Sequence, residues 1–82
     1  MENVNTISLK NVYHAIRQKR LEKQLNLFQM AQKLSISEKA YSHMERGLTA
    51  LTLDRFLHVA EILDVHPFDL MDDQKEKLSR AS

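Results

Sequence analysis

Histidines are the side chains of this sequence with the widest chemistry, because an imidazole can bind a metal, transfer a proton or donate to an anion. The chain of 82 residues has four histidines and no cysteine. His14, His43, His58 and His66 are separated by 29, 15 and 8 positions. No two of them stand three or four positions apart, so no pair lies on one turn of a helix as zinc ligands often do. We therefore expect no metal site and no cofactor.

Other catalytic arrangements are missing as well. Gly47 is the single glycine, so the chain has no glycine-rich loop that would hold a phosphate. No nucleophilic side chain stands at a recognisable spacing from a base, and we expect that the protein is not an enzyme. No stretch approaches about 18 apolar residues, and the N-terminus has no apolar signal core, so we expect a cytoplasmic protein with no membrane partner.

The charges divide the chain into a basic and an acidic half. Residues 10–46 carry eight lysines and arginines against three acidic residues, and residues 47–82 carry four against seven, within a net charge of +1. Ordinary solvated helix faces would explain this division. Alternatively, the basic half faces an anionic partner and the acidic half faces away from it. The charge pattern alone leaves both interpretations open.

The elements that position these side chains are predicted to be helices. Apolar residues recur at spacings of three and four, which predicts an all-α chain. Residues 1–8 are expected to form a flexible arm, residues 9–73 one domain, and residues 74–82 a polar tail or an extension of the last helix. The expected helices, with their capping residues, are 9–23 after Ser8, 27–34 after Asn26, 38–46 after Ser37, 53–63 after Thr52, and a fifth that starts at Pro67.

Each expected helix has an apolar side that should face the core. Gly47 follows the third helix, where a chain often enters the left-handed region that glycine tolerates best. The residues expected to face inward are Leu9, Val12, Tyr13, Ile16, Leu21, Met30, Ala31, Leu34, Ala40, Tyr41, Met44, Leu53, Phe56, Leu57, Val59, Ala60, Leu63 and the linker residue Val65.

The second and third helices are short and are joined by a four-residue turn, which is typical of a helix-turn-helix. Ala31 and Ala40 are small enough for a close crossing of the two helices, and Ile36 can fill the turn. Another kind of five-helix bundle fits this pattern about as well. The spacing alone therefore leaves the choice between the two open.

Two longer segments, "IRQKRLEKQLNLFQMAQKLSISEKAYSHMERG" and "TLDRFLHVAEILDVHPFDLM", carry a more specific pattern. Between Val12 and Met71 the chain resembles the Cro/lambda-repressor (XRE-type) helix-turn-helix family. This resemblance implies a compact five-helix DNA-binding domain whose second and third helices form the helix-turn-helix. The residues that stand in the family's register are Ile16, Arg20, Leu25, Ala31, Leu34, Ile36, Ser37, Glu45, Gly47, Leu53, Ala60, Leu63 and Val65.

The resemblance also implies roles for individual side chains. The third helix would enter the major groove, where lysine can donate to guanine, glutamate can accept from cytosine, and serine can bond to either kind of base edge. The residues expected to contact bases are Ser37, Glu38, Lys39, Ser42 and His43, and those expected to contact phosphates are Asn26, Arg17, Lys33 and Arg46. Arg20 and Glu45 would form a structural ion pair. A homodimer would form through Leu48, Ala50, Leu51, Phe68, Leu70 and Met71.

Several positions depart from the family's pattern. Leu27 and Phe28 stand where a polar start of the second helix is usual, so they either repack locally or form an exposed patch for a protein partner or for DNA sugars. Ser35 replaces a favoured glycine, which costs about 1 kcal/mol if its backbone is left-handed. Tyr41 replaces a branched apolar residue, so its hydroxyl needs a buried partner or must turn outward toward DNA.

The sequence therefore predicts a regulator that binds double-stranded DNA, namely a repressor or autoregulator that recognises a palindromic operator as a dimer. A protein-binding adaptor or antirepressor that uses Leu27 and Phe28 is one alternative. An antitoxin and a restriction–modification controller protein are two others. Lys39 and Arg46 on one helix favour DNA binding, because an adaptor does not need them.

Overall fold

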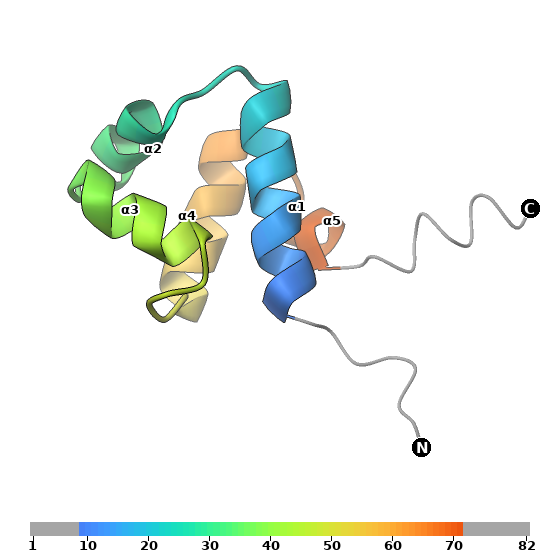
Figure 1. Ribbon diagram of the computed structural model, residues 1–82. Coiled ribbons are helices and arrows are strands. Elements are labelled where there is room, and N and C mark those ends of the chain that lie inside the picture. Colours follow the sequence, from blue (N-terminus) through green and yellow to red (C-terminus); the bar gives the residue numbers. More distant parts are fainter. Residues whose placement is uncertain (1–8, 72–82) are drawn as a thin grey trace, which may run out of the picture.

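Five α-helices make up the computed structural model over residues 9–71, which are the residues that the structure describes (Figure 1). They are α1 (Leu9–Glu22), α2 (Leu27–Leu34), α3 (Glu38–Glu45), α4 (Leu53–Leu63) and α5 (Pro67–Met71). No strand occurs among these residues, so the prediction of an all-α fold is confirmed. The expected arm at 1–8 with its Ser8 cap, residues 72–73 of the expected domain, and the tail at 74–82 lie outside the described residues.

The helices are arranged around α1 and α4, with α2 and α3 on one side and α5 on the other (Figure 1). α2 packs against α3 and α4, and α3 also packs against α1. The connection between α2 and α3 is only residues 35–37, so these two helices form the helix-turn-helix. None of the described helices has the length and apolar character needed to cross a membrane.

Short-range capping explains where the helices start. The side chains of Asn26, Ser37 and Thr52 each accept a hydrogen bond from the backbone N–H three residues later, at 2.7, 3.0 and 3.2 Å. Each bond satisfies an N–H group that the first turn of a helix leaves without an intrahelical partner. At α5, Nδ1 of His66 accepts from the N–H of Phe68 at 3.1 Å. All three side chains expected to cap α2, α3 and α4 therefore do so.

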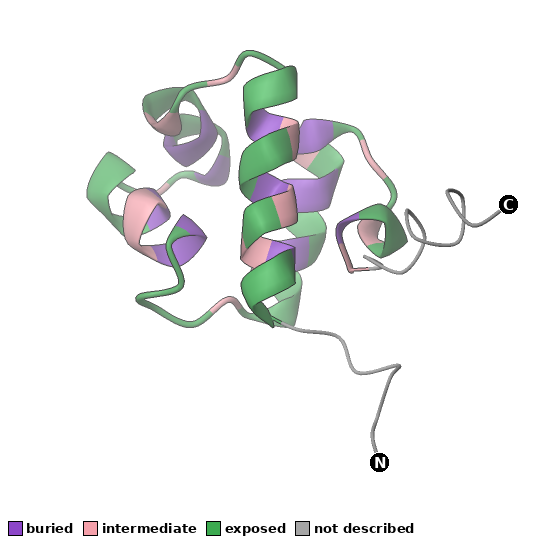
Figure 2. Ribbon diagram, turned by 45° about the vertical axis from the view of Figure 1, so that its right-hand side comes forward, coloured by how far each residue is buried: buried purple, intermediate pink, exposed green. Residues whose placement is uncertain are grey.

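The core lies where the apolar sides of the helices meet (Figure 2). Ile16, Met30 and Tyr41 have no measurable exposure. Burial of such side chains stabilises the fold by about 1.5–3 kcal/mol each, before the loss of conformational entropy is counted. The buried apolar residues are Val12, Ile16, Met30, Ala31, Leu34, Tyr41, Met44, Phe56, Val59, Ala60, Leu63 and Leu70.

Some residues expected in the core are exposed instead: Leu9, Leu21, Ala40, Leu53 and Leu57. Leu21 follows Val12 by nine positions, which turns its side chain to the opposite side of α1 at 100° per residue. Ala40 lies outside the buried stripe of α3, so it is not the small residue at the helix crossing. Leu9, Leu53 and Leu57 lie on sides of α1 and α4 that no described element covers.

Four of the described helices are followed, one or two residues after their last residue, by a residue with a left-handed backbone: Gln24, Ser35, Gly47 and Asp64, with φ of 59°, 60°, 78° and 59°. At each end the left-handed residue and the next one donate backward to the last turn, which is the Schellman arrangement. Gly47 meets a second constraint, because a Cβ atom there would lie 2.9 Å from Cε2 of Tyr13. Because the backbone of Ser35 is left-handed, its conformation costs about 1 kcal/mol relative to a glycine at this position.

Candidate nucleic-acid interface

The outward side of α3 carries the residues that the resemblance assigns to base contact. Ser37, Glu38 and Lys39 are exposed, and Ser42 and His43 are half-buried. The opposite side of α3 is buried against α1 and α2. One helix face therefore presents an ammonium, a carboxylate, two hydroxyls and an imidazole, which together supply hydrogen-bond donors and acceptors.

The basic residues assigned to phosphate contact lie on three different helices or at their ends. Arg17 is exposed on α1, Lys33 is exposed in the last turn of α2, and Arg46 is exposed directly after α3. Among the described residues, no hydrogen bond or ion pair occupies any of these three side chains. Their charges are therefore available to an external anion.

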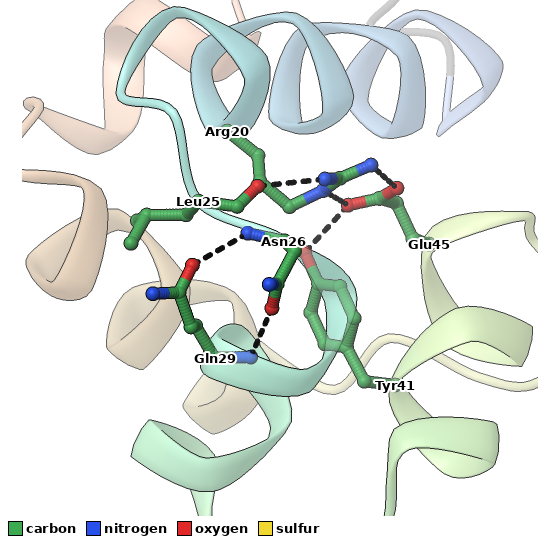
Figure 3. Close-up of polar contacts among 6 residues, drawn as sticks. All are labelled: Arg20, Leu25, Asn26, Gln29, Tyr41 and Glu45. Atoms are coloured by element: carbon green, nitrogen blue, oxygen red, sulfur yellow. Dashed lines mark hydrogen bonds and ion pairs between the residues drawn. The ribbon is translucent and has the colours of Figure 1, made fainter.

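A capping box at the start of α2 supplies two further donors (Figure 3). Oδ1 of Asn26 accepts from the N–H of Gln29 at 2.7 Å, and Oε1 of Gln29 accepts from the N–H of Asn26 at 2.8 Å. Both side-chain oxygens are used in this way, and no hydrogen bond among the described residues occupies either amide NH₂ group. Sequence reasoning did not assign Gln29 a role, although an Asn-x-x-Gln pattern at a helix start is a recognisable capping signal.

Arg20 and Glu45 form a bidentate ion pair between α1 and the end of α3 (Figure 3). Nε of Arg20 donates to Oε2 of Glu45 at 2.8 Å, and Nη2 donates to Oε1 at 3.0 Å. Each residue is only 6% exposed, so the pair fastens α1 to α3 in a largely dry environment. The hydrogen bond from Arg20 to Glu45 is the main cause that raises the pKa of the guanidinium, which therefore stays charged.

Tyr41 and Leu25 extend this pair into a network (Figure 3). The hydroxyl of Tyr41 points inward and donates to Oε2 of Glu45 at 2.6 Å, so it does not turn toward the outward face of α3. Nη1 of Arg20 donates to the backbone carbonyl of Leu25 at 2.8 Å. Burial raises the pKa of the Tyr41 hydroxyl and the hydrogen bond to Glu45 raises it further, so the phenol keeps its proton and remains a donor.

The residues assigned to a dimer interface do not all reach the surface. Leu48 and Phe68 are 61% and 66% exposed, and Ala50 is exposed as well. Leu70 is only 2% exposed and belongs to the core of the single chain, so its assignment to the interface is corrected. Leu51 and Met71 are half-buried and line a groove of about 260 Å³, together with Leu9, Val12, Leu53 and Phe56.

The expected apolar patch at the start of α2 is smaller than the sequence suggested. Leu27 is half-buried and packs against the core, because the first turn of α2 directs it inward. Phe28 remains 56% exposed. A single exposed apolar side chain is common on protein surfaces and does not by itself indicate a partner.

The histidines lie on separate elements. His14 is on α1, where its Nε2 atom lies 3.2 Å from Nε2 of Gln18. His58 is on α4, and His66 caps α5. Within residues 9–71, no group of three or more histidine, aspartate or glutamate side chains is arranged to hold a metal ion.

Comparison with known proteins adds one finding. A family model described as helix-turn-helix matches residues 16–70, which run from the middle of α1 to α5. Neither the curated proteins nor the solved structures gave a match. The match spans most of the chain and includes the whole of α2, α3 and α4. The chain therefore belongs to the XRE-type helix-turn-helix family, and it is a DNA-binding regulator of that type.

Proposed function

We propose that this protein represses transcription, including that of its own gene, by binding a palindromic operator as a homodimer. The observation that carries this proposal is the exposed side of α3, whose opposite side is fixed to α1 by the buried pair of Arg20 and Glu45. Base readout needs side chains held at a constant position relative to the phosphate contacts. A helix anchored from behind meets that requirement.

In this proposal the first two turns of α3 read base edges in the major groove. Lys39 donates to O6 and N7 of guanine, and Glu38 accepts from N4 of cytosine. Ser42 and His43 are half-buried and contact the groove closer to the axis of α3. Ser37 caps α3 with its side-chain oxygen, which leaves its hydroxyl proton free to donate.

Phosphates are contacted around this reading face. The free NH₂ groups of Asn26 and Gln29 and the unpaired N–H groups of the first turn of α2 donate to one phosphate, which the positive end of the helix also attracts. Arg46, Lys33 and Arg17 supply charges to neighbouring phosphates. These contacts fix the register of the protein on the duplex without carrying sequence information.

Exposed apolar side chains and an apolar groove support self-association. Phe68 and Leu48 are largely exposed, and Leu51 and Met71 line the groove. Leu9 and Leu53 also line the groove, although sequence reasoning had placed them in the core. A two-fold dimer through this surface sets two copies of α3 about 34 Å apart, one turn of duplex, and so requires a palindromic site.

Sedimentation velocity tests the dimer with a matched pair of variants. Phe68→Ser removes an exposed apolar side chain from the proposed interface, and Phe28→Ser removes a similarly exposed one from α2. We expect Phe68→Ser to weaken self-association by about tenfold or more, as for an interface anchor, and Phe28→Ser to leave it unchanged. Equal behaviour of the two variants would contradict this interface.

Selection of duplexes from a random library tests operator binding. The protein is incubated with the library and competitor DNA at about 0.15 M salt, where phosphate contacts alone give weak, non-specific binding. We expect an enriched palindrome whose half-sites lie about 10 base pairs apart. A folded protein that enriches no sequence would overturn the proposal.

A further inference from the structure

The guanidinium of Arg20 bonds to two parts of the chain that both carry residues proposed to contact DNA. Two of its N–H groups donate to Glu45, the last residue of α3. A third, on Nη1, donates to the carbonyl of Leu25, which directly precedes the N-cap residue Asn26. Since a guanidinium is planar and its N–H groups form a rigid fork, these bonds link the start of α2 to the end of α3.

The orientation of that fork depends on the carboxylate of Glu45. A second residue of α3 bonds to this carboxylate and fixes its position. Tyr41 lies one turn before Glu45 on α3, and its hydroxyl donates to Oε2 at 2.6 Å. Nε of Arg20 donates to the same oxygen at 2.8 Å. The ring of Tyr41 has no measurable exposure, so it cannot turn without disturbing close-packed neighbours.

A purely apolar residue at position 41 would fill the same part of the core. It would leave Oε2 of Glu45 with one donor fewer, and the plane of the carboxylate would be set by Arg20 alone. The phenol therefore contributes a polar contact that packing does not require, and burying a hydroxyl is favourable only when such a contact is made. The oxygen that accepts this contact, Oε2 of Glu45, also accepts from Arg20, and the guanidinium of Arg20 bonds to the carbonyl of Leu25.

We propose that Tyr41 is a positioning residue for DNA recognition: its hydroxyl fixes Glu45 and, through Arg20, sets the start of α2 relative to the outward side of α3. The consequence for DNA rests on the proposed function, whereas the coupling between the two helices is measurable on the free protein. Specific binding needs the phosphate contacts of α2 and the base contacts of α3 at the same time. Non-specific binding needs phosphate contacts alone.

Amide NMR spectra of the free protein and of Tyr41→Phe test the coupling. This change removes the hydroxyl and keeps the ring, so ring-current effects on neighbouring amides change little. We expect the amide resonances of Asn26 and Gln29 to move, because the Leu25 contact shifts. The amide of Arg55, bonded to the Thr52 cap of α4, should not move. Unmoved Asn26 and Gln29 amides in the folded variant would overturn the proposal.

A second variant tests the route through Arg20. Arg20→Lys keeps the charge and loses the fork, so it cannot bond to Glu45 and Leu25 in the same way. In this background Tyr41→Phe should no longer move the amides of Asn26 and Gln29. A response of the same size would show that Tyr41 acts without Arg20, and the proposal would be wrong. If Arg20→Lys does not fold, the spectra of Tyr41→Phe decide alone.

DNA binding supplies a readout that a merely structural role would not change. For Tyr41→Phe we expect the affinity for the selected operator to fall about tenfold, as when a hydrogen bond to a charged group is lost. The affinity for random duplex should stay the same. A loss shared equally by both duplexes would count against positioning. If the unaltered protein selects no operator, the proposed function is wrong. The amide spectra of the free protein still test the coupling between α2 and α3.

Discussion

Gly47→Ala is expected to destabilise the fold for two reasons that can be read from its geometry. Its φ of +78° costs a residue with a side chain about 1–2 kcal/mol. The new Cβ would also lie 2.9 Å from Cε2 of Tyr13, whereas apolar carbons prefer a separation of about 3.5–4.0 Å, so the ring must retreat. Alanine restricts the unfolded chain and returns about 0.4–1 kcal/mol. The net loss is about 1–2 kcal/mol once the contact with Tyr13 is added.

Thermal denaturation followed by circular dichroism measures this loss. For a domain of this size it corresponds to a fall in Tm of about 4–16 °C. Ser35→Gly is the matched control, because Ser35 has the same left-handed backbone. Relief of about 1 kcal/mol of strain is offset by about 0.4–1 kcal/mol for the freer unfolded chain, so its stability should stay the same or rise by at most about 0.6 kcal/mol. A Gly47→Ala variant as stable as the unaltered protein would refute the reasoning. A fall in Tm for Ser35→Gly would refute it too.

Three further predictions concern buried and exposed charges. Glu45→Gln should lower the free energy of unfolding, measured by urea denaturation, by about 3–5 kcal/mol, because it leaves the charge of Arg20 buried without a counter-charge. Glu22→Gln breaks the exposed pair with Lys19 and should cost less than about 1 kcal/mol, and similar losses for the two variants would contradict the burial argument. Because the pKa of Tyr41 is raised on folding, its contribution to stability is complete below about pH 10 and is lost as the pH rises further. The free energy of unfolding should therefore fall above that pH more steeply than in Tyr41→Phe, and parallel curves would argue against it. Arg46→Ala should weaken binding to all duplexes alike and reduce the slope of log K against log salt by about one, and a loss confined to one operator would assign Arg46 to base readout.

Local features of the fold could be predicted because their causes are local. Asn26, Ser37 and Thr52 act on N–H groups three residues away, so the sequence alone identifies the starts of α2, α3 and α4. Gly47 marks the end of α3 for the same reason. Gln24 and Asp64 adopt the same backbone without glycine, so residue type gave no signal for them.

Exposure was harder to predict, because periodicity identifies an apolar side of a helix but not what covers it. Leu53 lies next to the buried stripe of α4, yet no described element covers it. Leu70 was assigned to an interface because the family often uses that region, and here it fills the core. Phe28 and Leu27 are adjacent apolar residues, and they differ in burial because the first turn of α2 directs them to different sides.

Only part of the buried network could be predicted from the spacing of residues in the sequence. Tyr41 and Glu45 stand four positions apart, a spacing that brings two side chains together on one helix. Arg20 lies 25 positions before Glu45, and only the resemblance to a family suggested that the two would meet. The carbonyl of Leu25 is a backbone group, so no side-chain pattern reports its bond to Arg20.

Duplex selection repeated with Lys39→Ala tests most directly that α3 reads the sequence of the operator. Lys39 is exposed on α3 and free of partners among the described residues, so its removal should leave the fold intact. We expect the variant to enrich the same palindrome with information lost at one or two base pairs of each half-site, since a base-contacting side chain contributes about 1–3 kcal/mol of discrimination. Identical motifs from the two proteins would contradict base readout by Lys39. A motif that weakens evenly at every position would contradict it as well.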